Sequence, residues 1–115
     1  MEQLADPQTS TPICIQTTLK IMGDKWTAKI LHELSVNVTT FSALESSLES
    51  ISPRTLSQRL DMLERENIVV KQQYCEHPPR FKYVLTPKGV ELQEVIVKMA
   101  EWGGRYYTDK QIACD

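Results

Sequence analysis

A polar run near the middle of the chain carries side chains suited to contacting base pairs. Ser52-Pro53 is followed by Arg54, Ser57 and Gln58. Arginine pairs with the edge of guanine and glutamine with that of adenine, whereas serine can contact either base. A serine followed by a proline is typical of the start of a helix, where free N–H groups also attract a phosphate. The run therefore predicts a helix that reads double-stranded DNA with its first turns.

The leucines of this segment place the polar run on the outer face of the predicted helix. Three of them fall within about 60° of one another around the helical axis, namely Leu56, Leu60 and Leu63. Three residues at flanking angles are expected to contact backbone phosphates, namely Ser52, Thr55 and Arg59. Asp61 and Glu64 are expected to point away from DNA because they would repel it. A solvated surface helix has the same polar face and is the alternative.

The hydrophobic pattern changes its period from about 3.6 to 2 after Asn67. β-branched residues from Ile68 onwards predict a strand to about Tyr74, and the alternation over residues 81–85 predicts a second strand. The segment His77-Pro78-Pro79 cannot lie inside a ladder of hydrogen bonds, so it predicts the connecting loop. The sequence thus predicts a β-hairpin directly after the polar helix.

Two cations of this hairpin are candidate DNA contacts. Arg80 follows the prolines of the loop, and arginine is weakly hydrated and fits a narrow minor groove. Lys82 could contact phosphates; a solvated turn is the alternative. Residues 52–88 carry seven Lys or Arg and four acids, a charge of +3, within a chain whose net charge is -2. A basic segment between acidic ends suits a surface that faces phosphates.

Four helices are expected before the hairpin and one after it. Candidate N-caps precede four of them, namely Asp24, Thr39 or Thr40, Ser52 and Thr86. The first helix starts at Pro12, a turn over Glu45–Ile51 joins the third and fourth, and the last helix runs to Gly103-Gly104. This order predicts a mainly α fold with a small β-hairpin, which is the winged helix-turn-helix arrangement.

Length and composition indicate one domain. The chain has 115 residues, of which 41% are hydrophobic, enough for a single core. We expect a flexible arm at residues 1–11, the domain at 12–104 and a tail at 105–115. No apolar run reaches the roughly 18 residues of a membrane span, the acidic N-terminus is not a secretory signal, and three cysteines do not form a disulfide framework. A cytoplasmic protein with reduced thiols and no membrane partner is expected.

The sequence lacks the residue patterns of enzymes. It has no nucleophile elbow, P-loop or dinucleotide-binding glycine pattern, and His32-Glu33 lacks the second histidine of a zinc protease. Cys75 and His77 could form half of a metal site, but no second pair is spaced to complete it. We therefore expect no catalytic activity, no metal and no cofactor.

Several segments together are similar to one family. They include Gly23-Asp24-Lys25-Trp26-Thr27, the block Ile51–Leu60 and the block Pro78–Thr86. Over residues 12–104 the chain resembles the HxlR-type transcriptional regulators, which are related to the MarR-type winged-helix proteins. The resemblance implies a homodimer that binds operator DNA through two winged helices and regulates transcription.

The resemblance also implies that the terminal helices, residues 12–22 and 87–104, form the dimer contact. The candidate interface residues are Leu19, Leu92, Val95, Ile96, Met99 and Trp102. Because the last helix is terminal, one side of its apolar stripe lacks a partner within one protomer, and a dimer would cover it. The chain departs from the family pattern at Asp24 and Asn67, which replace glycines, and at Thr40, which replaces an arginine expected to contact phosphate.

Cys14 is the candidate sensor of a regulatory signal. It lies in the first turn of a predicted helix, where free N–H groups stabilise a thiolate, and some family members sense oxidants or electrophiles at the matching position. The alternative is a small buried hydrophobic residue. Trp26 and Trp102 could also line a pocket, so a small-molecule effector is a second candidate.

A winged helix that binds protein and has little affinity for DNA is the main alternative function. The negative net charge and the missing basic residue at Thr40 favour it. A steep loss of duplex affinity with rising salt would distinguish DNA binding from this alternative.

Overall fold

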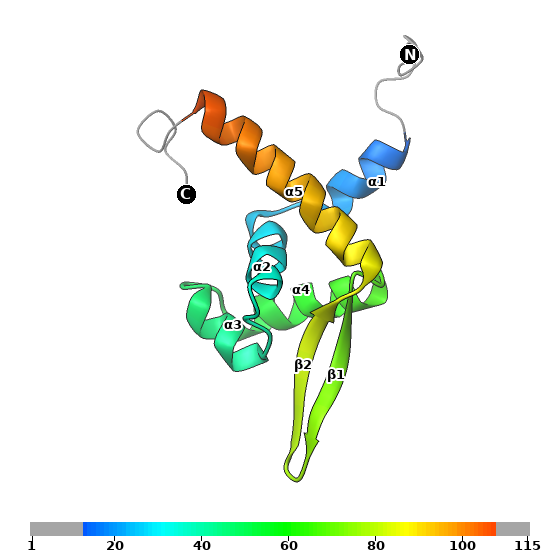
Figure 1. The fold of residues 1–115 in the computed structure, drawn as a ribbon, viewed down its shortest axis with the longest axis vertical. Helices are drawn as coiled ribbons and strands as arrows, with labels where there is room; N and C mark the ends of the chain where they lie inside the picture. The colour runs from blue at the N-terminus through cyan, green and yellow to red at the C-terminus, as the bar shows by residue number, and fades with distance from the viewer. Residues whose placement is uncertain (1–12, 108–115) are drawn as a thin grey trace.

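The structure is a computed structural model that describes residues 13–107. Its elements in chain order are α1 (Ile13–Met22), α2 (Lys25–Ser35), α3 (Phe41–Ser47), α4 (Pro53–Arg65), β1 (Val69–Glu76), β2 (Pro79–Leu85) and α5 (Pro87–Tyr106). In Figure 1, α2, α3 and α4 form the centre, the hairpin projects from one end, and α1 and α5 lie towards the other. The expected winged helix-turn-helix arrangement, mainly α with one small hairpin, is confirmed.

Polar side chains cap four helices where the sequence predicts caps. Asp24 Oδ1 accepts hydrogen bonds from the backbone N–H groups of Trp26 and Thr27 at 2.9 and 3.0 Å. The caps of α3, α4 and α5 are Thr40, Ser52 and Thr86. Each cap satisfies an N–H group that lacks a partner within its helix, which fixes where the helix begins.

The core lies where α2, α3 and α4 meet the base of the hairpin. Leu56, Leu60 and Leu63 have no exposed surface, which confirms the predicted buried face of α4. The other core residues are Ile30, Leu31, Leu34, Leu44, Leu48, Ile51, Ile68, Val69 and Tyr83. Burying a leucine side chain contributes about 1.5–3 kcal/mol, so α4 is anchored along its inner face and presents only its outer face to solvent.

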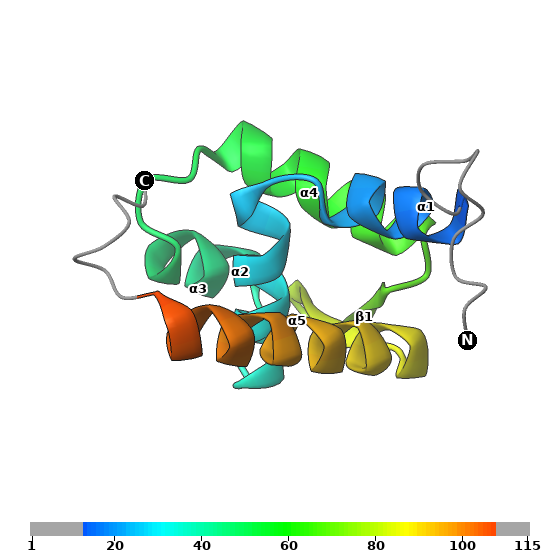
Figure 2. The same cartoon turned by 90° about the horizontal axis from the view of Figure 1, so that it is seen from above.

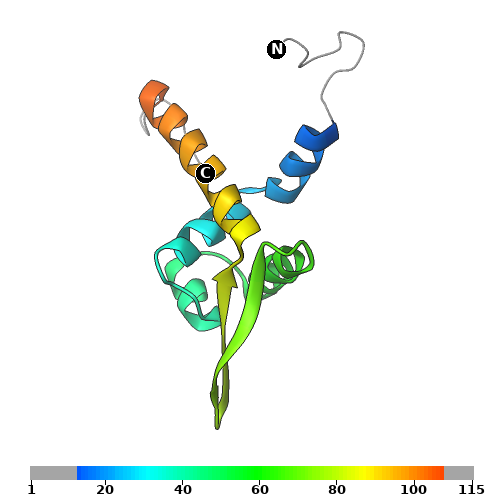
Figure 3. The same ribbon diagram turned by 45° about the vertical axis from the view of Figure 1, so that its right-hand side comes forward.

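The hairpin is a two-stranded antiparallel sheet that projects from the core. Val69 lies opposite Leu85 at its base. The backbone N–H of Tyr83 donates to the carbonyl of Thr39 at 2.9 Å, which ties β2 to the segment before α3. Beyond the base both strands are largely exposed, and Figures 1 and 3 show them extending away from the helices.

The junctions around α4 differ slightly from those expected. α3 continues to Ser47 and Leu48 caps it, so the turn into α4 is shorter than the expected Glu45–Ile51. Ser50, with φ 76°, reverses the chain in this turn. Asn67, with φ 62°, ends α4 in the expected left-handed conformation. These two residues orient α4 relative to α3 and to the hairpin.

α5 is longer than expected. It passes through Gly103 and Gly104 and ends at Tyr106, although each glycine costs a helix about 1 kcal/mol relative to alanine. The rings of Trp102 and Tyr106 lie one turn apart with centroids 5.5 Å from each other, bridging the glycine pair. The expected arm at 1–11, Pro12, and residues 108–115 of the expected tail lie outside the described residues.

α1 and α5 leave the core on the same side and diverge from each other, as Figures 1 and 3 show, and the view from above in Figure 2 shows them apart. No residue of α1 is buried. In α5 only Gly89 and Gln93 are buried. Both helices therefore carry faces that the rest of the protomer does not cover.

Candidate nucleic-acid interface

The outer face of α4 presents the three predicted base-contacting residues to solvent. Arg54, Ser57 and Gln58 are all exposed, whereas Leu56 on the inner face is fully buried. The first turn of α4 contains no acidic residue, so nothing there repels a phosphate or the edge of a base. This face can donate and accept hydrogen bonds in a groove of DNA without any rearrangement of the core.

Ser52 and Thr55 form a small hydrogen-bonded unit at the start of α4. Ser52 Oγ accepts from the backbone N–H of Thr55 at 3.0 Å and donates to Thr55 Oγ1 at 3.0 Å. The serine hydroxyl is therefore committed to the cap. Thr55 Oγ1 keeps its proton for another acceptor, such as a phosphate oxygen.

Two cations of the hairpin, Lys71 and Arg80, line a cleft together with Ser57 of α4. Arg80 is exposed near the tip, and Lys82 is half-buried and pairs in register with Gln72. Lys71 lies on β1 with its Nζ 4.9 Å from the centre of the Phe81 ring. The stems of such residues pack on the strand while their charges reach solvent, which suits contact with phosphates.

A cleft of about 570 Å³ separates α4 from the hairpin. Its lining residues are Thr40, Phe41, Ser42, Ser57, Asp61, Lys71, Tyr74, Arg80, Phe81 and Tyr83. Two cations, Lys71 and Arg80, face one carboxylate across this cleft. That carboxylate is Asp61, which lines the cleft and does not turn away from the candidate interface as expected.

Asp61 and Glu64 of α4 also act on the buried Tyr83. Burial raises the pKa of the Tyr83 hydroxyl above its ordinary value, and the negative charges of Glu64 and Asp61 raise it further. The hydroxyl of Tyr83 therefore stays neutral at physiological pH and adds no negative charge to the cleft.

Arg59 lies differently from the other predicted contact residues. Its Nε forms an ion pair with Asp24 Oδ2 at the start of α2. Nε is also buried and is not aligned for a hydrogen bond, so the contact is a charge pair at close range. This ion pair was not predicted from the sequence.

The predicted dimer residues divide into two groups. Leu19, Val95, Met99 and Trp102 have 56%, 47%, 51% and 55% of their surface exposed. Leu92 and Ile96 instead pack against the core. The latter two face inwards because α5 packs on α2, so one side of the predicted stripe belongs to the protomer's own core.

The two described cysteines differ in exposure. Cys14 is exposed in the first turn of α1, and Cys75 is half-buried on β1. The alternative to a sensor role, that Cys14 is a small buried residue, therefore does not hold within a single protomer. Cys114 lies outside the described residues.

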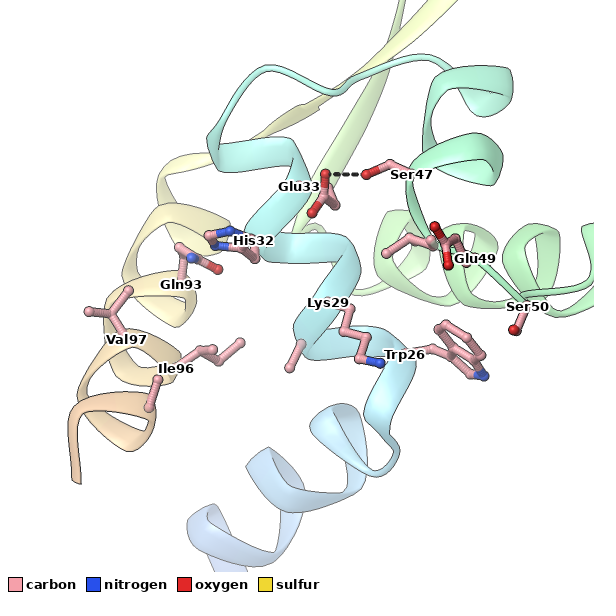
Figure 4. Close-up of a pocket in the computed structure, with 13 residues that line it drawn as sticks. Trp26, Lys29, His32, Glu33, Ser47, Glu49, Ser50, Gln93, Ile96 and Val97 are labelled. Atoms are coloured by element: carbon pink, nitrogen blue, oxygen red, sulfur yellow. Dashed lines mark hydrogen bonds between the residues drawn. The ribbon is translucent and has the colours of Figure 1, made fainter. Parts of the chain in front are cut away.

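A second hollow lies between α2, the end of α3 and α5, as Figure 4 shows. Its volume is about 660 Å³, and Trp26 is part of its wall, as the sequence suggested. Trp102 does not line it. Gln93 is 8% exposed, and its Oε1 is buried without a hydrogen-bond partner among residues 13–107.

Gln93 was not among the residues predicted from the sequence. The signal was its spacing, because Gln93 lies four residues after Gly89 and three before Ile96 and so falls on the inner face of α5. A polar residue on that face must find a partner or remain unsatisfied.

Residues 13–107 contain no group of three or more His, Cys, Asp or Glu side chains placed to hold a metal ion. None of the helices between these residues combines the length and hydrophobicity that a bilayer-crossing segment needs.

Comparisons with known proteins agree with this architecture. A family model described as "HxlR-like helix-turn-helix" matches residues 21–111. The uncharacterized HTH-type transcriptional regulator YdeP from Bacillus subtilis is 34% identical over 92 residues, which cover 80% of this chain and 72% of YdeP.

Solved structures show the same fold. A regulator of the MarR family from Enterococcus faecalis matches with a TM-score of 0.76 at 28% identity, covering 85% of this chain and 89% of the other. The transcriptional regulator YodB from Bacillus subtilis matches in its reduced form with a TM-score of 0.75 at 29% identity, covering 84% of this chain and 95% of YodB. The diamide-treated form of YodB matches with a TM-score of 0.73.

Proposed function

The chain belongs to the HxlR-like helix-turn-helix family of transcription regulators, whose members are not enzymes, and on this basis we propose that it binds a pseudo-palindromic operator as a homodimer in the cytoplasm. One observation carries the proposal. α4 buries its leucine face in the core and exposes Arg54, Ser57 and Gln58 on the other. Recognition helices of this fold read the major groove with their N-terminal residues.

The hairpin supplies contacts beside the groove. Arg80 enters the neighbouring minor groove, while Lys82 binds phosphates together with the hydroxyl of Thr55. Ser52, predicted as a phosphate contact, instead holds Thr55 through the cap of α4. The cleft between α4 and the hairpin supports this assignment, because its two cations outnumber its one carboxylate. A phosphate backbone passing along the cleft would meet Lys71.

Dimerisation brings two such units together. The exposed apolar side chains of α1 and α5 support the proposal that these helices pair with those of a second copy. Val95, Met99 and Trp102 line α5 at helical spacing, and Leu19 projects from α1. Leu92 and Ile96 stabilise the same helix by packing against the core of the protomer.

A selection of bound sequences from a random duplex library tests the proposed function. We expect recovery of two inverted half-sites whose centres lie about one helical turn, or 34 Å, apart. Recovery of a single half-site would contradict the homodimer. Recovery of no enriched sequence would favour the alternative, a winged helix that binds protein, which the negative net charge and Thr40 support.

We also propose that oxidants or electrophiles regulate the protein through Cys14. The support is its exposure at the start of α1 and the existence of a diamide-treated form of the similar protein YodB. Diamide, a thiol oxidant, should change the DNA affinity of the wild type and of Cys75→Ser, but not that of Cys14→Ser. Equal responses of the two variants would rule out Cys14 as the sensor.

A small-molecule effector is the second regulatory candidate, favoured by the hollow of Figure 4 and by one of its lining residues, Gln93, whose Oε1 is buried without a hydrogen-bond partner among residues 13–107. A compound that donates a hydrogen bond to this atom should raise the melting temperature of the wild type and not that of Gln93→Leu. Because the hollow lies between α2 and α5, its occupant would act on the angle between the DNA-binding core and the dimer helix.

A further inference from the structure

The two carboxylate oxygens of Asp24 contact two different helices. Oδ1 accepts from the backbone N–H groups of Trp26 and Thr27 at 2.9 and 3.0 Å and so caps α2. Oδ2 forms the ion pair with Arg59 Nε on α4. One carboxylate therefore fixes the start of α2 and holds a cation of α4 at the same time.

The ion pair fixes one end of the Arg59 guanidinium and leaves the other end available. Nε is buried, yet 33% of the side chain is exposed. The solvent contact therefore lies in the rest of the side chain, which carries the two Nη groups. Asp24 and Arg59 form no other ion pair within residues 13–107. An arginine anchored at Nε can still donate through both Nη groups, which form the fork that matches a phosphate.

Arg59 and the hairpin lie on opposite flanks of α4. Ser57 and Asp61 line the cleft that faces the hairpin, whereas Arg59 contacts the start of α2. At 100° per residue, Arg59 lies about 160° around the axis from Ser57. A helix in the major groove has a phosphate backbone on each side, so the cations of the hairpin serve one side only and Arg59 is placed for the other.

We propose that Asp24 is a positioning residue for DNA binding, which orients the Arg59 guanidinium so that its Nη groups meet a phosphate on the flank of α4 remote from the hairpin. This rests on the proposed function and assigns a role within it. Anchoring Nε removes side-chain freedom before binding, so less is lost when the phosphate contact forms. The ion pair and the cap neutralise the negative charge of Asp24, which reduces its repulsion of a phosphate.

Asp24→Asn tests this role. Asparagine caps a helix about as well as aspartate, so α2 keeps its start while the charge that holds Arg59 is removed. We expect binding to a fluorescent mixed-sequence duplex of about three turns to weaken about 2- to 10-fold per protomer. The melting temperature should change little, which separates this effect from a loss of folding.

Asp61→Asn is the matched control, because it removes the same charge from the opposite flank of α4. It should tighten duplex binding by removing repulsion in the cleft beside the hairpin. If only the loss of a negative charge mattered, both variants would bind duplex more tightly. Weaker binding of Asp24→Asn together with tighter binding of Asp61→Asn therefore supports the positioning role. Tighter or unchanged binding of Asp24→Asn would overturn it.

Arg59→Gln completes the test. Loss of the Arg59 guanidinium should reduce the slope of log K for duplex binding against log salt by about 0.9 for each phosphate contact removed. Asp24→Asn should leave this slope nearly unchanged. In the Arg59→Gln background, Asp24→Asn should cause no further weakening; an equal loss in both backgrounds would show that Asp24 acts only through the fold. If the wild type itself does not bind duplex, the proposed function fails; if it binds and Asp24→Asn does not weaken it, only this inference fails.

Discussion

Gly89 in the first turn of α5 lies directly against the backbone carbonyl of Ile68. A methyl group on Gly89 would stand 2.1 Å from that oxygen, which is far closer than non-bonded atoms approach. Ile68 O also accepts hydrogen bonds from Thr86, through its N–H at 3.0 Å and its hydroxyl at 3.1 Å. The start of α5 is therefore locked onto the junction between α4 and β1, which couples the candidate dimer helix to the DNA-binding core.

Gly89→Ala should destabilise the protein because the new methyl group displaces backbone and cannot be relieved by a side-chain rotation. We expect a loss of about 1–3 kcal/mol in the free energy of unfolding, as for overpacked cores. Gly103→Ala in the same helix is the control. It meets no atom within 4 Å and should stabilise by about 0.5–1 kcal/mol. Urea denaturation measures both, and equal effects would contradict the close packing at Gly89.

Arg54→Ala should relax base preference at one position of each half-site. The expected cost is about 1–3 kcal/mol for the preferred base, since a bidentate contact is lost. Competition between duplexes that differ at single positions measures it. Lys98→Ala, a highly exposed cation on α5, should leave the preference unchanged. A uniform loss over all sequences would show that Arg54 contacts only the phosphate backbone.

Val95→Glu should produce monomers, because a carboxylate on the exposed face of α5 would be buried in the proposed dimer. Val36→Glu is the matched control, since Val36 is 53% exposed and Val95 is 47% exposed, but Val36 lies beyond the end of α2, away from the helix pair. Sedimentation at micromolar concentration should show dimers for the wild type and Val36→Glu. A wild-type monomer would refute the interface.

Stability should fall at alkaline pH through Tyr83. Burial and the charges of Glu64 and Asp61 raise the pKa of this hydroxyl above 10.0 in the folded protein. Because the pKa of Tyr83 is higher in the folded than in the unfolded protein, ionisation of its hydroxyl favours unfolding. The stability that the neutral hydroxyl contributes is therefore complete below pH 10.0 and is lost as the pH rises through the folded pKa. Tyr83→Phe should remove this part of the pH dependence. In an absorbance titration of tyrosinate, Tyr83 should ionise above pH 10.0, and this part of the absorbance change should be missing from Tyr83→Phe.

Local chemistry made much of the fold predictable. Asp24, Ser52 and Thr86 each cap the helix that follows, since a cap depends on a few neighbouring residues. The leucines of α4 repeat at helical spacing, so its inner and outer faces could be assigned from the sequence. The placement of Arg54 on the outer face followed directly.

Contacts between distant segments could not be predicted in the same way. The ion pair of Asp24 with Arg59 depends on how α2 crosses α4, and neither residue carries a local signal of it. The apolar stripe of α5 could not be divided between core and interface from its spacing. Only the packing of α5 on α2 shows that Ile96 turns inwards while Val95 stays exposed.

Duplex binding measured over a range of salt concentrations shows whether α4 and the hairpin bind double-stranded DNA. We expect log K for a selected duplex to fall linearly with log salt, with a slope of about -0.9 for each phosphate contacted. Lys82→Ala should make this slope shallower. An absence of duplex binding at low salt, or an affinity that does not change with salt, would show that α4 and the hairpin do not bind DNA through its phosphates.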